Sequence, residues 1–222
     1  MDRRFETIIV IAKEPVPGRV KTRLMPSFTA YEAAELAAAA ISDTLRAAAA
    51  VAAVTHLIVL QGRAAALRPA ADGWLITPQV SGDLDARLVA AFAAANPAGA
   101  AVLVGMDTPQ LRAGDLSVFD PRHFDACLGL AHDGGYWAIG FRDPTFARAT
   151  IAGVPMSRAD TGAVQLARLR DAGLRVQLLD ELTDVDTYAD AQAVAALDPA
   201  TEFAATFTAI TRVRPVAAVG VR

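Results

Sequence analysis

The alternation of strand-like and helical segments is the feature that most restricts the fold. Short apolar runs typical of β-strands lie at residues 7–12, 55–61, 74–77, 100–105, 126–131, 136–141 and 175–179. Helical patterns separate most of them, at residues 31–51, 83–95, 158–172 and 187–197. Because strands that alternate with helices pair mostly in parallel, this order predicts an α/β fold with helices on both faces of a mostly parallel sheet.

Domain organisation is predicted from the same pattern. Asp133-Gly134-Gly135 forms a tight connection between two strand-like runs, so one strand there is expected to pair antiparallel. No Ser-rich or Pro-rich linker divides the chain, which predicts a single domain over residues 1–200. Residues 201–222 are expected to form a final helix and an apolar arm. The arm can pack on the body of the same chain or on another subunit, and in the second case the protein would be an oligomer.

Composition narrows the class of partner. The net charge of −3 and the pI near 5.6 argue against nucleic-acid binding, which needs a basic face. The hydrophobic content of 54% is high, and the excess is largely alanine. No apolar stretch is long enough to cross a bilayer, and the first residues lack the pattern of a signal peptide. We therefore expect a cytoplasmic protein without a membrane span. The single cysteine, Cys127, excludes an internal disulfide and is expected in the core.

A basic loop directly follows the first strand-like run. It places Lys13, Arg19, Lys21 and Arg23 within eleven residues, and two prolines and Gly18 prevent a helix there. At the carboxyl edge of an open α/β sheet, such a loop can hold phosphate groups by charge-assisted hydrogen bonds. The alternative is a solvated basic loop, since charge runs usually face water. With the acidic overall charge, the loop predicts a small phosphorylated ligand.

Two acidic segments follow later strands. Asp107 lies in the turn after residues 100–104, where a carboxylate can bind a divalent metal or serve as a helix N-cap. Asp184 and Asp186 follow the last strand-like run. Asp186 or Thr187 can cap the next helix, with Asp190 as the acid of a capping box. Two acids separated by one residue in an extended segment point to the same side, which suits Mg²⁺ or Mn²⁺ shared with phosphate.

Two further segments are candidates for ligand contacts. Gln79 offers a donor and an acceptor that can read a base edge, whereas Asp83 is also an ordinary helix cap. Around the predicted turn, glycines permit close backbone approach to a ligand and aromatic rings offer a surface to a sugar or acceptor. The alternative is a hairpin turn with half-buried rings. The predicted acceptor residues are Asp133, Gly134, Gly135 and Tyr136.

Taken in order, these motifs resemble one family. They are Ala12-Lys13-x-Pro15-x-Pro17-Gly18-x-x-Lys21-Thr22-Arg23-Leu24, Gly82-Asp83-Leu84-x-x-Arg87, Gly105-x-Asp107-x-Pro109, Asp133-Gly134-Gly135-Tyr136 and Asp184-Val185-Asp186-Thr187. Over residues 7–197 the chain resembles the DUF2064 group of glycosyltransferase-A-fold proteins. The basic loop and the last acidic motif are more distantly similar to those of 2-phospholactate and molybdenum-cofactor guanylyltransferases. The chain departs from the family pattern at Glu14, Asp85 and Met156.

The resemblance implies a three-layer αβα, Rossmann-like nucleotide-diphospho-sugar transferase (GT-A) fold with a divalent metal. Asp107 and Asp186 match the two metal acids of the family, and with Lys21 they form the predicted catalytic set. The predicted nucleotide- and phosphate-binding residues are Lys13, Gly18, Arg19, Lys21, Arg23, Gln79, Gly82 and Asp83.

The expected activity is metal-dependent transfer from an activated nucleotide to a small-molecule acceptor. Glycosyl transfer from a nucleotide-sugar is the first hypothesis. The alternatives are guanylyl-type nucleotidyl transfer from a nucleoside triphosphate to a small phosphorylated acceptor, and a nucleotide-binding module without turnover.

Overall fold

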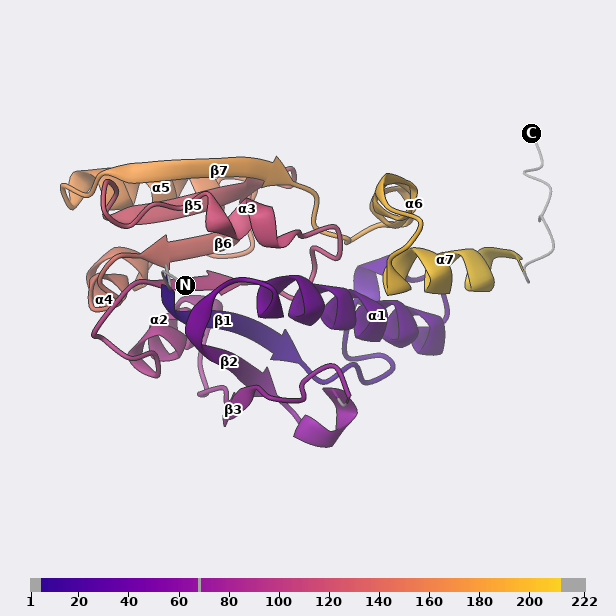
Figure 1. The fold of residues 1–222 in the computed structure, drawn as a ribbon. Helices are drawn as coiled ribbons and strands as arrows, with labels where there is room; N and C mark the ends of the chain where they lie inside the picture. The colour runs from indigo at the N-terminus through magenta and orange to yellow at the C-terminus, as the bar shows by residue number, and fades with distance from the viewer. Residues whose placement is uncertain (1–4, 68, 213–222) are drawn as a thin grey trace.

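The computed structural model of this chain describes residues 5–67 and 69–212, and a seven-stranded sheet forms its centre (Figure 1). The strand order is β3-β2-β1-β4-β6-β5-β7. β6 pairs antiparallel with β4 and β5, and the other pairs are parallel, as predicted. The strands are β1 (Phe5–Lys13), β2 (Ala53–Gln61), β3 (Leu75–Pro78), β4 (Ala101–Val104), β5 (Ala126–Ala131), β6 (Tyr136–Phe141) and β7 (Val176–Leu182).

The position of β1 creates the place where a ligand can bind. β2 lies on one side of β1 and β4 on the other, so the connections leaving these strands run in opposite directions along the sheet. In open α/β sheets, ligands bind at such a reversal, beyond the carboxyl ends of the strands. The basic loop leaves β1 at this point, and Asp107 follows β4 at the same edge.

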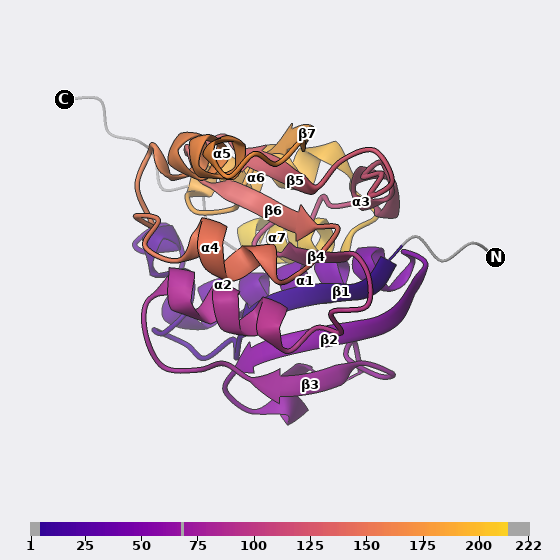
Figure 2. The same ribbon diagram turned by 90° about the vertical axis from the view of Figure 1, so that its left-hand side faces the viewer.

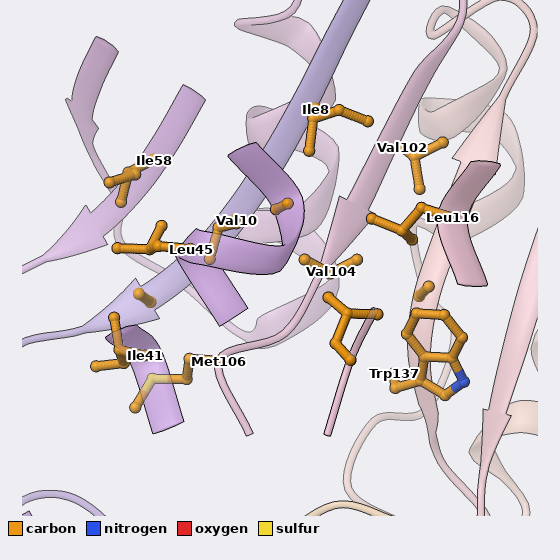
Figure 3. Close-up of a cluster of buried hydrophobic side chains, with 14 of the residues drawn as sticks. Ile8, Val10, Ile41, Leu45, Ile58, Val102, Val104, Met106, Leu116 and Trp137 are labelled. Atoms are coloured by element: carbon orange, nitrogen blue, oxygen red, sulfur yellow. The ribbon is translucent and has the colours of Figure 1, made fainter. Parts of the chain in front are cut away.

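Helices cover both faces of the sheet because successive strand residues point to opposite sides. Ile8 and Val10 of β1 face Ile41 and Leu45 of the first helix, whereas Ile9 belongs to the core on the other face (Figure 3). That second face is covered by α2, α4 and α5, and Figure 2 shows α2 and α4 side by side in front of the sheet. The helices are α1 (Ala30–Ala49), α2 (Leu84–Ala93), α3 (Ala113–Ser117), α4 (Phe146–Ile151), α5 (Thr161–Asp171), α6 (Tyr188–Leu197) and α7 (Glu202–Arg212).

The C-terminal helix α7 packs beside α1 and α6 (Figure 1). Its Phe203 and Phe207 lie in a third apolar cluster together with Phe28 and Leu36. The buried Asp43 of α1 accepts hydrogen bonds from the backbone N–H groups of Glu202 and Phe203, at 3.1 and 2.8 Å. This side chain therefore satisfies two of the unpaired N–H groups at the start of α7. The boundary predicted at residue 200 stays a prediction.

The seven predicted strands and four predicted long helices are confirmed, with ends that differ by up to three residues. The sequence did not predict α3, α4 or the 3₁₀ helices Thr22–Leu24 (η1) and Ala64–Leu67 (η2), because elements this short show no clear period. The predicted apolar arm at residues 215–221 lies outside the described residues. In the described part of the chain, no helix is both long and apolar enough to span a membrane.

Candidate functional site

A pocket of about 740 Å³ lies at the carboxyl ends of β1 and β4. Its volume is within the usual range for small-molecule sites. It brings together most of the residues that the sequence predicts for a site: Lys13, Arg19, Lys21, Arg23, Gln79, Asp83, Asp107, Asp133, Gly135, Tyr136 and Asp186. Gly18, Gly82 and Gly134 are not among its lining residues. Gly18 and Gly82 instead shape the neighbouring loops, with φ of 75° and 119°.

Lys21 lies between the two predicted metal carboxylates. Its Nζ is 2.9 Å from Asp107 Oδ1 and 3.2 Å from Asp186 Oδ1, and only 7% of its side chain is exposed. Burial alone would lower the pKa of Lys21, but the two carboxylates outweigh it and raise the pKa above its ordinary value. Lys21 is therefore a cation held between two carboxylates in the pocket lining.

Hydrogen bonds to the backbone fix the segments that carry the two carboxylates relative to each other. The N–H of Val185 donates to the carbonyl of Asp107 at 3.0 Å, and the side-chain amide of Gln110 donates to the carbonyl of Thr183 at 2.7 Å. These bonds join the segments that follow β4 and β7. Lys21 itself has left-handed backbone angles, φ 48° and ψ 39°, and is the N-cap residue of η1. Non-glycine residues adopt this conformation where the surrounding structure enforces it, often at functional sites.

The capping alternatives for the acidic residues are resolved by the helix ends. Thr187 caps α6, and Asp190 completes its capping box, which leaves the Asp186 side chain to bind Lys21 and Arg23. Asp107 is not an N-cap, because the next helix, α3, begins after Arg112. Asp83 has the N-cap position of α2, yet within the described chain its side chain makes no capping hydrogen bond. All three carboxylates line the pocket.

Asp184 adds a further carboxyl group to the pocket. Burial and the negative charges of Asp107 and Asp133 raise its pKa to about 7, against the opposing effect of Lys21. Asp186 has the opposite shift: burial would raise its pKa, but Lys21 and Arg23 hold it below the usual range. At this edge of the sheet, the Lys21 ammonium is thus outnumbered by the carboxyl groups of Asp107, Asp184 and Asp186.

The residues present fit a divalent metal. Asp107 and Asp186 provide hard oxygen ligands of the type that Mg²⁺ and Mn²⁺ prefer, and both converge on one point that the Lys21 ammonium occupies. Within residues 5–67 and 69–212, no group of three or more His, Cys, Asp or Glu side chains has the arrangement of a complete metal site. A metal held here would therefore complete its coordination with phosphate oxygens or water, as Mg²⁺ commonly does.

Gln79 presents only part of its amide to the pocket. Its Nε2 donates to the carbonyls of Ala12 and Val59, at 2.7 and 3.1 Å, and so bridges the ends of β1 and β2. The sequence prediction gave Gln79 both a donor and an acceptor for a base. Because the amide hydrogens are bonded to the sheet, the oxygen Oε1 is the group left for a ligand.

Two residues that depart from the family pattern, Glu14 and Asp85, make contacts outside the pocket. Glu14 binds Arg63 through both carboxylate oxygens, with hydrogen bonds of 2.9 Å to the backbone N–H and 2.8 Å to Nε. Asp85 accepts a hydrogen bond of 2.8 Å from the N–H of Gly153. Neither residue lines the pocket, whereas Met156 does, with its sulfur 3.8 Å from the Tyr136 hydroxyl.

The predicted glycine turn supports the pocket wall. Gly134 has φ of 87°, and its Cα lies so close to the Ala159 carbonyl that a side chain would clash. Its carbonyl also accepts a hydrogen bond of 2.8 Å from the N–H of Gly162. The close approach that Gly134 permits is therefore to the loop before α5, at residues 155–160. Gly135 and Tyr136 line the pocket beside this loop.

Several lining residues were not predicted from the sequence. Arg87 was quoted only as part of a motif, and Ser157 and Arg158 carry no signal that points to a site. Arg158 binds Asp160 through two hydrogen bonds, so its charge is shared with that carboxylate. The apolar side chains of Ile11, Leu84 and Leu88 complete the wall near the start of α2. These residues come from separate segments of the chain, so only the folded structure shows that they line one pocket.

Comparison with solved structures finds this fold among transferases that use nucleotides. A protein from Desulfovibrio desulfuricans G20, provisionally assigned as a nucleotide-diphospho-sugar transferase, is 29% identical, with a TM-score of 0.79 over 93% of this chain and 94% of that chain. The 2-C-methyl-D-erythritol 4-phosphate cytidylyltransferase of Thermus thermophilus is 16% identical, with a TM-score of 0.52 over 86% and 98%. A CMP:2-keto-3-deoxy-manno-octonic acid synthetase in complex with CTP is 14% identical, with a TM-score of 0.54 over 86% and 98%.

The fold, the pocket and these likenesses define a nucleotide-using transferase. No curated protein sequence matches the chain. The chain belongs to the family described as "Uncharacterized protein conserved in bacteria (DUF2064)", whose family model matches residues 44–158.

Proposed function

We propose that this protein is a divalent-metal-dependent transferase that moves a sugar from a nucleotide-sugar to a small-molecule acceptor. One observation carries the proposal: Asp107 and Asp186 converge on a buried cation inside a pocket that the basic loop also lines. A pair of acids next to several cations is suited to a phosphate chain with its metal. The site lies at the strand reversal where nucleotides bind in related α/β sheets.

Each group has a role in this proposal. Lys13 and Arg19 bind the phosphates of the donor from the exposed side of the loop, and Arg23 binds them from beside Asp186. A bound Mg²⁺ or Mn²⁺, held by Asp107 and Asp186, supplies the charge that stabilises the leaving phosphate oxygens. Gln79 Oε1 and Asp83 face the base or ribose. Asp133, Gly135 and Tyr136 form the acceptor side, where the ring of Tyr136 offers a surface to a sugar.

Sugar transfer is preferred over nucleotidyl transfer for two reasons. The similar protein with the higher identity, at 29% over most of both chains, bears a nucleotide-diphospho-sugar transferase assignment, whereas the likeness to the cytidylyltransferase, at 16%, shows the fold alone. In addition, Lys21 and Arg23 already share their charge with Asp186. The loop therefore has less free positive charge for a triphosphate than its sequence suggests.

Nucleotidyl transfer remains the second candidate, because Lys13, Arg19, Lys21 and Arg23 all line the one pocket. The two reactions differ in the bond that breaks. In sugar transfer, the bond from the anomeric carbon to the phosphate oxygen breaks, the acceptor oxygen takes the carbon and loses a proton, and a nucleoside diphosphate leaves. In nucleotidyl transfer, the acceptor oxygen attacks the α-phosphorus and pyrophosphate leaves.

The test is to identify the leaving group. The protein is incubated with Mg²⁺ or Mn²⁺, a panel of acceptors and each class of donor, and phosphorus NMR follows the products. We expect acceptor-dependent nucleoside diphosphate from a nucleotide-sugar. Acceptor-dependent pyrophosphate from a triphosphate would replace this proposal with nucleotidyl transfer. Metal-dependent binding without either product would instead indicate a binding module.

A further inference from the structure

We propose that Lys21 holds the metal position closed until a nucleotide binds, so that the protein takes up metal and nucleotide together and not the metal alone. This inference rests on the proposed function, since it assigns a metal to Asp107 and Asp186. It concerns a step before any chemistry, and it can be measured by binding alone.

The contacts of Lys21 carry the inference. Its Nζ is within 3.2 Å of one oxygen of each carboxylate, and its side chain is 7% exposed. The ammonium therefore occupies the point on which both carboxylates converge. Arg23 contacts the same site differently: it binds the other oxygen of Asp186, at 2.9 Å, and its side chain is 67% exposed. Of these two cations, Lys21 is the one that bridges the pair.

A divalent ion cannot join Asp107 and Asp186 while the ammonium stays between them. The two cations would compete for the same oxygens, and their mutual repulsion is strong at a short distance in a partly buried pocket. Lys21 must give up at least one carboxylate before the ion can enter. Without another anion, the displaced ammonium would stay buried with one or both of its two partners lost, which is costly.

A nucleotide removes this cost. Its phosphate oxygens are anions that the ammonium can bind in place of a carboxylate, and they also complete the coordination of the metal. Metal and nucleotide therefore each favour the binding of the other, and this coupling is reciprocal. Lys21 lies between β1 and η1, outside any strand, so a shift of its side chain needs no change in the sheet.

The experiment compares Mn²⁺ binding by three proteins: the parent, Lys21→Met and Arg23→Met. Electron paramagnetic resonance of free Mn²⁺ gives each dissociation constant, first with Mn²⁺ alone and then with UDP or GDP present. We expect Lys21→Met to bind Mn²⁺ alone at least about tenfold more tightly than the parent. Arg23→Met removes one positive charge from the same pocket but leaves the bridge, so it is the matched control and is expected to change the constant less than about threefold.

Two results would overturn the inference. The first is that Lys21→Met binds Mn²⁺ alone no more tightly than the parent, and the second is an equal gain in Arg23→Met, which would indicate a general effect of charge. A cooperative thermal transition confirms that each variant is folded, and Lys21→Gln replaces Lys21→Met if the latter has none. If the parent binds no nucleotide, the proposed function fails, while the comparison with Mn²⁺ alone still decides the role of Lys21.

Discussion

The backbone N–H of Val185 donates a hydrogen bond of 3.0 Å to the carbonyl of Asp107. The bond joins the turn after β4 to the segment between β7 and α6. In the sheet, β6 and β5 lie between β4 and β7. It holds Asp186 and Asp107 close enough for Lys21 to contact both. The candidate metal site is therefore assembled from three separate segments, and its geometry depends on the sheet behind it.

The two carboxylates are tested by Asp107→Asn and Asp186→Asn. Asparagine keeps the size of aspartate but lacks the charge that a divalent ion requires, so metal-stimulated turnover is expected to fall by about 10²-fold or more in each variant. The melting temperature is expected to change by less than about 4 °C, because neither side chain caps a helix. In each variant the asparagine oxygen can still accept a hydrogen bond from Lys21, and the other carboxylate stays paired with it. Asp171→Asn, at the end of α5, is the control. Turnover that stays at the parent level in both variants would remove the metal role.

The exposed cations of the loop are tested by Lys13→Ala and Arg19→Ala. Both residues line the pocket, so each substitution removes a charge-assisted contact of about 1.5–3 kcal/mol with phosphate, or roughly ten- to a hundredfold in affinity. Arg63→Ala is the matched control, because Arg63 is an exposed cation that binds Glu14 outside the pocket. Titration calorimetry with a nucleotide gives the dissociation constants. Equal losses in all three variants would show that only the net charge matters.

The glycine turn is tested by Gly134→Ala. This position has φ of 87° and no space for a Cβ beside Ala159, so the change is expected to lower the free energy of unfolding by about 1–3 kcal/mol and to shift the loop at residues 155–160. Gly173→Ala separates the two effects, because Gly173 has φ of 77° with open space around it. Denaturant unfolding measures both variants. If Gly134→Ala lowers the free energy of unfolding by no more than Gly173→Ala does, the close approach to Ala159 does not affect stability.

Asp125 is predicted to make stability depend on pH in the acid range. Hydrogen bonds from Arg175, together with the charge of Arg142, hold the pKa of this buried carboxyl below its ordinary value. The unfolded chain thus binds a proton at a higher pH than the folded chain, so the stabilisation is complete above about pH 4 and is lost as the pH falls further.

Asp125→Asn is therefore expected to lower the free energy of unfolding by about 1–3 kcal/mol at pH 7. The difference in the free energy of unfolding between this variant and the parent should become smaller as the pH falls below 4, because protonation removes the same charge from the parent. Denaturant titrations at pH 7, 5 and 3 measure it. A difference that is constant over this range would show that the charge of Asp125 contributes nothing.

Local patterns in the sequence were sufficient for the strands and the long helices, and most of the residues that they marked for a site line the pocket. Period-two and helical patterns depend on neighbours along the chain, which is why residues 126–131 and 136–141 were predicted with the ends that the structure shows. Basic and acidic side chains at the ends of strands were predicted to meet because parallel strands place their carboxyl ends at one edge. In the structure, Lys13 and Asp107 both line the pocket at this edge.

Tertiary structure decided what those side chains do there. The sequence places Lys21 among the phosphate ligands, but only the fold shows it between Asp107 and Asp186, because that contact joins residues distant in the chain. The same holds for Glu14. Its place in the basic loop predicts a position near the pocket, but in the fold it binds Arg63 and does not line the pocket. Periodicity and composition report on backbone and burial, whereas the pairing of charges depends on distances in space that no local pattern contains.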